Sequence, residues 1–148
     1  MSRFGVLKRV VVGMAVVFAA LQLVPYGWRH PNPPVTQAVD WPTPEVEQLA
    51  RGACYDCHSN ETDWPVYSYV APMSWLVRRD VEAGRDELNL SEGDDDFDDA
   101  AEAIEDGSMP PRQYRLMHSD ARLSADEKAT LIAALELMDE SEDSSGPG

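Results

Sequence analysis

Two cysteines and a histidine lie within five consecutive residues, Cys54-Tyr55-Asp56-Cys57-His58, and the chain has no other cysteine. The order C-x-x-C-H is typical of covalent haem attachment. Two thiols three positions apart can add to the two vinyl groups of one haem. The imidazole that follows then lies under the iron and can supply its fifth ligand. The segment therefore predicts one haem c, bound through Cys54 and Cys57, with His58 as the proximal iron ligand.

Three other interpretations of these residues stay open. A redox-active dithiol of the thioredoxin type needs a strand before the motif and a helix after it, and the neighbouring segments are not strand-like. A zinc site could combine both cysteines with His58 and His118, although two adjacent ligands do not match the spacing of ordinary zinc modules. The cysteines could also be structural residues beside a surface histidine.

A second iron ligand is expected in residues 107–111, which read Gly-Ser-Met-Pro-Pro. The prolines predict an extended loop, because a fixed φ and a missing N–H are incompatible with a helix interior. Met109 follows His58 by 51 residues, so the chain can pass around a haem and return on its opposite face. Met109 is therefore the predicted distal ligand. Met73 is expected to pack in the core, and His118 is the alternative ligand.

Helices that could position these residues are predicted on both sides of the motif. Thr43 is a good N-cap for a helix that begins at Pro44, and a capping box opens the last helix. The four predicted helices run from Pro44 toward Gly52, from Pro72 to Ala83, from Phe97 to Glu105, and from Ser124 to Met138. No segment alternates as a strand does. We therefore expect an all-α domain, in which a bound group completes a thin core.

The N-terminal residues have the pattern of a membrane-targeting segment. Residues 1–24 contain three basic residues and no acidic one, and residues 10–24 carry no charge. Fifteen helical residues span roughly 22 Å, which is less than the ~30 Å of a hydrocarbon core. Basic side chains that reach the interface, with Tyr26 and Trp28 as anchors, make up the difference. We expect an uncleaved signal anchor; a cleaved signal peptide and a buried soluble helix are the alternatives.

These features divide the chain into four predicted parts. Residues 1–27 form the signal anchor, and residues 28–42, with four prolines, form an extended linker. Residues 43–139 form the helical domain, and residues 140–148 form a disordered tail. The basic flank is expected to stay in the cytoplasm. This topology predicts a single-pass protein of the inner membrane with its helical domain in the periplasm.

The charge of the chain excludes one class of function. The chain has 12 Lys and Arg against 27 Asp and Glu, a formal net charge of -15. A nucleic-acid binder that neutralises phosphates needs a basic surface, so we expect none here. Six of the eight residues from Glu92 to Asp99 are acidic, and Asp99 stands where an EF-hand requires glycine. This run is expected to be a solvated face or a docking surface for a basic redox partner.

Other side chains are candidates for the surroundings of a haem. Four aromatic residues could line it, although such residues more often form ordinary core: Trp64, Tyr67, Trp75 and Tyr114. Four arginines could pair with its propionates, because a guanidinium matches a carboxylate: Arg78, Arg79, Arg85 and Arg112.

Residues 43–138 resemble a small class I cytochrome c domain, in which a first helix leads into C-x-x-C-H, a Met-Pro loop follows, and a last helix packs on the first. More narrowly, the sequence resembles a bacterial haem-binding domain family. The resemblance lies in residues 54–62 (CYDCHSNET), 70–77 (VAPMSWLV), 84–85, 88–89 and 109–111 (MPP). It implies a helical domain that is wrapped around haem.

Together these features predict a membrane-anchored, exported mono-haem c-type cytochrome that transfers electrons. With His58 and Met109 on the iron, no position is open for a substrate, so the protein is not expected to be an enzyme. A haem-based sensor is the alternative, and an accessory module of a peroxidase system is a further one.

Overall fold

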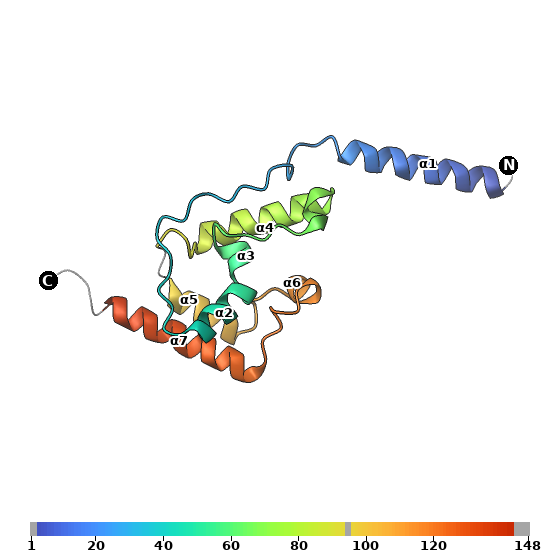
Figure 1. Ribbon diagram of the computed structural model, residues 1–148. Coiled ribbons are helices and arrows are strands. Elements are labelled where there is room, and N and C mark those ends of the chain that lie inside the picture. Colours follow the sequence, from blue (N-terminus) through green and yellow to red (C-terminus); the bar gives the residue numbers. More distant parts are fainter. Residues whose placement is uncertain (1–2, 94–95, 144–148) are drawn as a thin grey trace. The chain divides into compact units, whose positions relative to one another are not determined.

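The computed structural model of the protein describes residues 3–93 and 96–143 (Figure 1). Over these residues the chain forms α-helices and one 3₁₀-helix and no strand, which confirms the all-α fold. The elements are α1 (Arg3–Leu21), α2 (Pro44–Ala53), α3 (Tyr55–His58), η1 (Val66–Tyr69), α4 (Met73–Glu87), α5 (Phe97–Glu105), α6 (Arg112–Met117) and α7 (Ala125–Asp143).

The chain forms two compact units, and each is described by itself. The first unit comprises residues 3–31 and 64–80, and the second comprises residues 32–63 and 81–143. The boundary after Asp80 falls inside α4. The C-x-x-C-H motif therefore belongs to the second unit, and the N-terminal apolar helix belongs to the first.

Helix α1 begins at Arg3, seven residues before the uncharged run, and none of its side chains is buried. It is long and apolar enough to cross a membrane. A membrane anchor and a signal sequence both have these properties, so α1 could be either of them.

Helix α2 begins as the sequence predicts. The Thr43 hydroxyl accepts a hydrogen bond from the Val46 N–H at 3.2 Å, and Pro44 occupies the first helical turn. This cap satisfies an N–H that has no partner within the helix. The helix then buries one face, which includes Val46 and Ala50.

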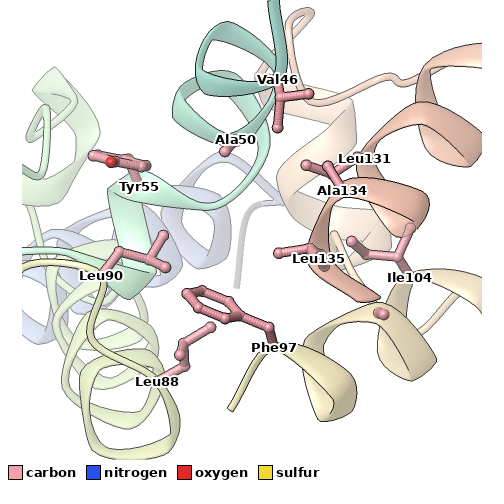
Figure 2. Packing of buried hydrophobic residues seen from close by; sticks show 11 residues of the cluster. Val46, Ala50, Tyr55, Leu88, Leu90, Phe97, Ile104, Leu131, Ala134 and Leu135 are labelled. Atoms are coloured by element: carbon pink, nitrogen blue, oxygen red, sulfur yellow. The ribbon is translucent and has the colours of Figure 1, made fainter. Parts of the chain in front are cut away.

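The core of the second unit lies between α2, α5 and α7 (Figure 1). Figure 2 shows how the buried side chains of these helices converge with Tyr55 of α3 and two leucines that follow α4. The cluster comprises Val46, Ala50, Tyr55, Leu88, Leu90, Phe97, Ala101, Ile104, Leu131, Ala134 and Leu135. A large apolar side chain buried in this way contributes about 1.5–3 kcal/mol. The last helix therefore closes on the first helix of the domain, as expected.

The structure differs from the predicted elements at several places. Helix α4 does not stop at Gly84, because the Leu88 N–H still bonds to the Gly84 carbonyl at 3.0 Å. Leu76 of this helix, an apolar residue type that favours the core, is exposed. Helix α7 continues to Asp143, and the rest of the predicted tail, residues 144–148, lies outside the described residues. Asp94 and Asp95 of the acidic run lie outside them as well.

Candidate haem site

The C-x-x-C-H motif forms a single helical turn. The N–H groups of Cys57 and His58 both bond to the Cys54 carbonyl, at 3.1 and 2.9 Å. Residues three apart in a helix lie on the same side, so the two thiols share one side of the turn. The cysteines do not form a disulfide. We call residues 54–58 the attachment turn.

His58 is held by backbone groups of the segment that follows α4. Its Nδ1 lies 3.2 Å from the Leu88 carbonyl oxygen, and its own carbonyl accepts the Leu90 N–H at 2.8 Å. Because a carbonyl can only accept, Nδ1 carries the proton and Nε2 keeps its lone pair for a metal. Burial lowers the pKa of His58, and the hydrogen bond to Leu88 opposes that shift. The ring therefore favours the neutral form that binds iron.

Helix α4 passes the attachment turn at a glycine. A Cβ added at Gly84 would lie 2.6 Å from the Cys57 carbonyl oxygen and 3.0 Å from its Cβ. Real Cβ atoms do not approach a backbone oxygen this closely. The missing side chain of Gly84 therefore allows α4 to approach the motif closely, which explains why a glycine stands inside this helix.

This contact gives a prediction in which two effects oppose each other. Alanine is favoured over glycine in a helix by about 1 kcal/mol, but overpacking against backbone costs about 1–3 kcal/mol or more. The Cys57 carbonyl is fixed in its helical turn, so the cost lies at the upper end of this range. We therefore expect Gly84→Ala to lose a net of about 2 kcal/mol of unfolding free energy in denaturant melts of the haem-loaded protein.

The matched control for this prediction lies one residue earlier on the same helix. Ala83 is exposed, and Ala83→Gly should lose only about 1 kcal/mol from its lower helix propensity. A Gly84→Ala protein as stable as the wild type would contradict the close approach of α4.

A buried polar network, which no pattern in the sequence predicts, supports the segment that holds His58. Asn60 is fully buried; its Nδ2 donates to the Pro34 carbonyl at 3.1 Å and to Glu92 Oε1 at 2.9 Å, and its Oδ1 accepts from Asn89. Its backbone N–H bonds to Ser91 Oγ at 2.9 Å. Asn60 thereby joins three segments of the second unit. The only sequence signal was a run of polar residues directly after the motif.

Arg85, which was a candidate for a haem propionate, makes a separate set of hydrogen bonds in the same unit. Its Nε donates to the Ser59 carbonyl at 2.7 Å, and its Nη2 donates to Thr62 Oγ1 at 2.9 Å and to Asn32 Oδ1 at 3.2 Å. These bonds connect α4 to the residues after the attachment turn. Arg85 is therefore a structural residue of the second unit.

Helix α6 lies against the attachment turn through Asp56. The Tyr114 hydroxyl donates to Asp56 Oδ2 at 2.7 Å, and His118 Nδ1 lies 3.6 Å from the same oxygen. The two rings stack with centroids 4.0 Å apart. Burial raises the pKa of Tyr114, and the bond to Asp56 and the nearby cysteines raise it further. The chain that follows Met109 therefore returns to the cysteines.

The structure places Met109 in the loop after α5, four residues beyond its last residue, Glu105. Its N–H bonds to the Ala103 carbonyl at 2.9 Å, and its side chain is 36% exposed. The thioether is thus held on a fixed backbone without being part of the core cluster. Met73, which was expected in the core, is also exposed. Trp64, Tyr67 and Trp75 belong to the first unit.

The environment of the cysteines bears on the alternative interpretations. Burial raises the pKa of the Cys54 thiol to about 12, and Cys57 adds to this shift. A redox-active dithiol needs the opposite, a lowered pKa that produces a thiolate. Within residues 3–93 and 96–143, no three His, Cys, Asp or Glu side chains converge as ligands of a metal ion. Two thiols and one imidazole nitrogen are the groups that a covalently attached haem would use, and this donor set fits it better than it fits a redox-active dithiol or zinc.

A helical domain with this attachment turn is of the haem-binding class. The family model described as "Haem-binding domain" matches residues 16–136, which include the attachment turn and Met109. The chain belongs to this haem-binding domain family. No curated protein and no solved structure matches the sequence.

Proposed function

We propose that the protein is a membrane-anchored, exported mono-haem c-type cytochrome that transfers electrons. The observation that carries this proposal is the hydrogen bond from His58 Nδ1 to the Leu88 carbonyl. It orients the imidazole and leaves Nε2 for iron, on a turn whose two cysteines share one side. Cys54 and Cys57 would hold the haem covalently, and His58 and Met109 would be the axial ligands.

The proposed role of the chain is to keep both axial positions filled. A bound haem supplies a one-electron couple at its iron. The chain holds His58 through Leu88 and fixes the backbone of Met109 through Ala103. With two protein ligands in place, a substrate has no position on the metal, and the protein is a carrier and not an enzyme.

Export and anchoring are supported by α1 and by the chemistry of attachment. Helix α1 can span a membrane, and its basic flank favours the cytoplasmic side. Thioether attachment of haem takes place outside the cytoplasm, where the second unit would then lie. We propose the inner membrane with the haem domain on the periplasmic side.

The redox partner we propose has a basic docking face. Helix α5 and the residues beside it expose acidic side chains, which are Glu92, Asp96, Asp98, Asp99, Glu102 and Glu105. A surface of one sign raises the rate of encounter with a partner of the other sign and makes that rate depend on salt.

A haem-based sensor is the second candidate function, and one observation favours it. The Met109 side chain is 36% exposed and lies outside the buried core cluster. A ligand held in this way can be displaced from iron by a small gas. The two functions differ in whether the iron of the resting protein has a free position.

An optical spectrum of the full chain, produced with the cytochrome c maturation machinery, tests the proposed function. We expect a low-spin reduced-minus-oxidised spectrum, full reversibility over repeated cycles, and slow binding of carbon monoxide. A five-coordinate, high-spin ferrous form that binds carbon monoxide at once would support the sensor. A chain that takes up no haem would contradict both.

A further inference from the structure

The first unit exposes a set of large apolar side chains within eleven residues. Val66 and Tyr69 of η1 are 86% and 63% exposed. They are three apart in a 3₁₀-helix and therefore share one side. Met73 and Leu76, three apart on α4, do the same. We call Val66, Tyr69, Val70, Met73 and Leu76 the apolar cluster; exposed apolar sets of this kind mark interaction sites.

The apolar cluster lies at the end of α1. Gln22 directly follows the helix, and its side-chain amide pairs with the backbone of Ala71. Its Nε2 donates to the Ala71 carbonyl at 3.1 Å, and its Oε1 accepts the Ala71 N–H at 2.9 Å. A chain advances at most about 3.6 Å per residue, so Val70 and Tyr69 lie within about 7 Å of Ala71. The part of the cluster nearest Ala71 is therefore held at the level at which α1 ends.

Further contacts tie the segment after α1 to the cluster. The His30 ring stacks on Tyr69 at 4.1 Å between centroids, meets Trp64 edge-on at 4.7 Å, and its Nε2 donates to the Ser68 carbonyl at 2.9 Å. Arg78 donates to the Arg29 carbonyl at 2.7 Å. His30, which reads as a plain linker residue in the sequence, is thus a packing residue of the first unit.

The first unit differs in its charge from the rest of the chain. Outside α1, the first unit carries Arg29, Arg78 and Arg79 and only one acidic residue, Asp80. The other 26 of the 27 acidic residues belong to residues 32–63 and 81–148. Basic side chains near a membrane surface are attracted to anionic lipids, and exposed aromatic rings favour the interface. Tyr26 and Trp28 are exposed in the same unit.

We propose that the apolar cluster inserts into the headgroup region of an anionic lipid bilayer, next to the point where α1 leaves the membrane. This inference rests on the proposed anchoring by α1 and adds a second contact with the same membrane. The pairing of Gln22 with Ala71 fixes the cluster beside the helix, and the three arginines meet the lipid phosphates. The first unit then lies on the membrane surface instead of extending from it as a free stalk.

Photo-crosslinking on the full, haem-loaded chain tests this proposal. p-Benzoylphenylalanine replaces Tyr69 in one variant and Val66 in a second, and the protein is reconstituted in vesicles of phosphatidylethanolamine and phosphatidylglycerol. The matched control is the same replacement of Leu137 on α7, which is 60% exposed beside acidic residues. Mass spectrometry then counts lipid adducts, and we expect about tenfold more at positions 66 and 69 than at 137, because the acidic surface is repelled by anionic lipid.

The possible outcomes separate this inference from the function on which it rests. If the protein stays in the vesicles after an alkaline wash but gives equal numbers of lipid adducts at all three positions, the proposed membrane contact is wrong and the anchor stands. Adducts to a second copy of the chain, without lipid adducts, overturn it in favour of a protein interface. If the protein isolated from cells lacks its first residues, or if the wash removes it from the vesicles, both the anchor and this inference are wrong. The haem spectrum of the same samples reports on the cytochrome independently.

Discussion

Replacing Cys54 and Cys57 together by alanine is expected to abolish haem staining of the denatured protein on a gel, while the wild type keeps its stain. Only a covalent bond survives denaturation, and these are the only thiols in the chain. The same variant should lose cooperative unfolding at the melting temperature of the wild type. A group that binds only the folded state stabilises it, and the core cluster of the second unit comprises only eleven side chains.

The control for the double variant keeps the number of substitutions and avoids the site. Gln48 and Gln113 are exposed, and their replacement by alanine should change neither staining nor melting. Staining that persists without the cysteines would contradict thioether attachment. A melt unchanged by their loss would contradict the role of haem in the core.

The second large effect is expected for Met109→Ala. The wild-type ferric protein should be six-coordinate and low-spin, with the weak far-red band of a sulfur–iron bond. The variant should lose this band, bind carbon monoxide readily and have a lower reduction potential, because a thioether favours ferrous iron. Optical spectra, carbon monoxide mixing and a redox titration measure these three changes.

Met73 provides a matched control for this experiment, because its side chain is exposed to a similar degree, 41% against 36%. Met73→Ala should leave all three properties unchanged. If the wild type already binds carbon monoxide as fast as Met109→Ala, the sensor is the better description. If His118→Ala alone alters the spectrum, the axial pair is His58 and His118, and the potential is lower.

Local signals made several elements predictable from the sequence. The Thr43 cap and Pro44 define the start of α2, and α5 runs from Phe97 to Glu105 as predicted. The capping box is present as well, with the Ser124 N–H bonded to Glu127 Oε2 at 2.7 Å. These signals act within one or two turns of a helix, so they need no knowledge of the fold.

Features that depend on tertiary contacts were not predictable in this way. Gly84 looks like a helix stop, and only its approach to Cys57 shows why a helix continues through it. Leu76 and Met73 look like core residues, and the structure exposes both. The burial of Asn60 depends on partners about 30 residues away, Glu92 and Asn89. Residue type gives no direct information about such distant partners.

The acceptor of the His58 proton has a consequence for the electronic character of the site. A carboxylate in this place would draw the Nδ1 proton and make the ring a stronger, imidazolate-like donor, which stabilises ferric iron. The Leu88 carbonyl is a neutral acceptor, and it belongs to the backbone, so no change of pH alters its charge. If His58 holds haem iron as proposed, its imidazole would therefore be a moderate donor, and the ferrous state would be correspondingly easier to reach. In a haem-loaded protein with His58 on the iron, pH would therefore not act on the metal through this hydrogen bond.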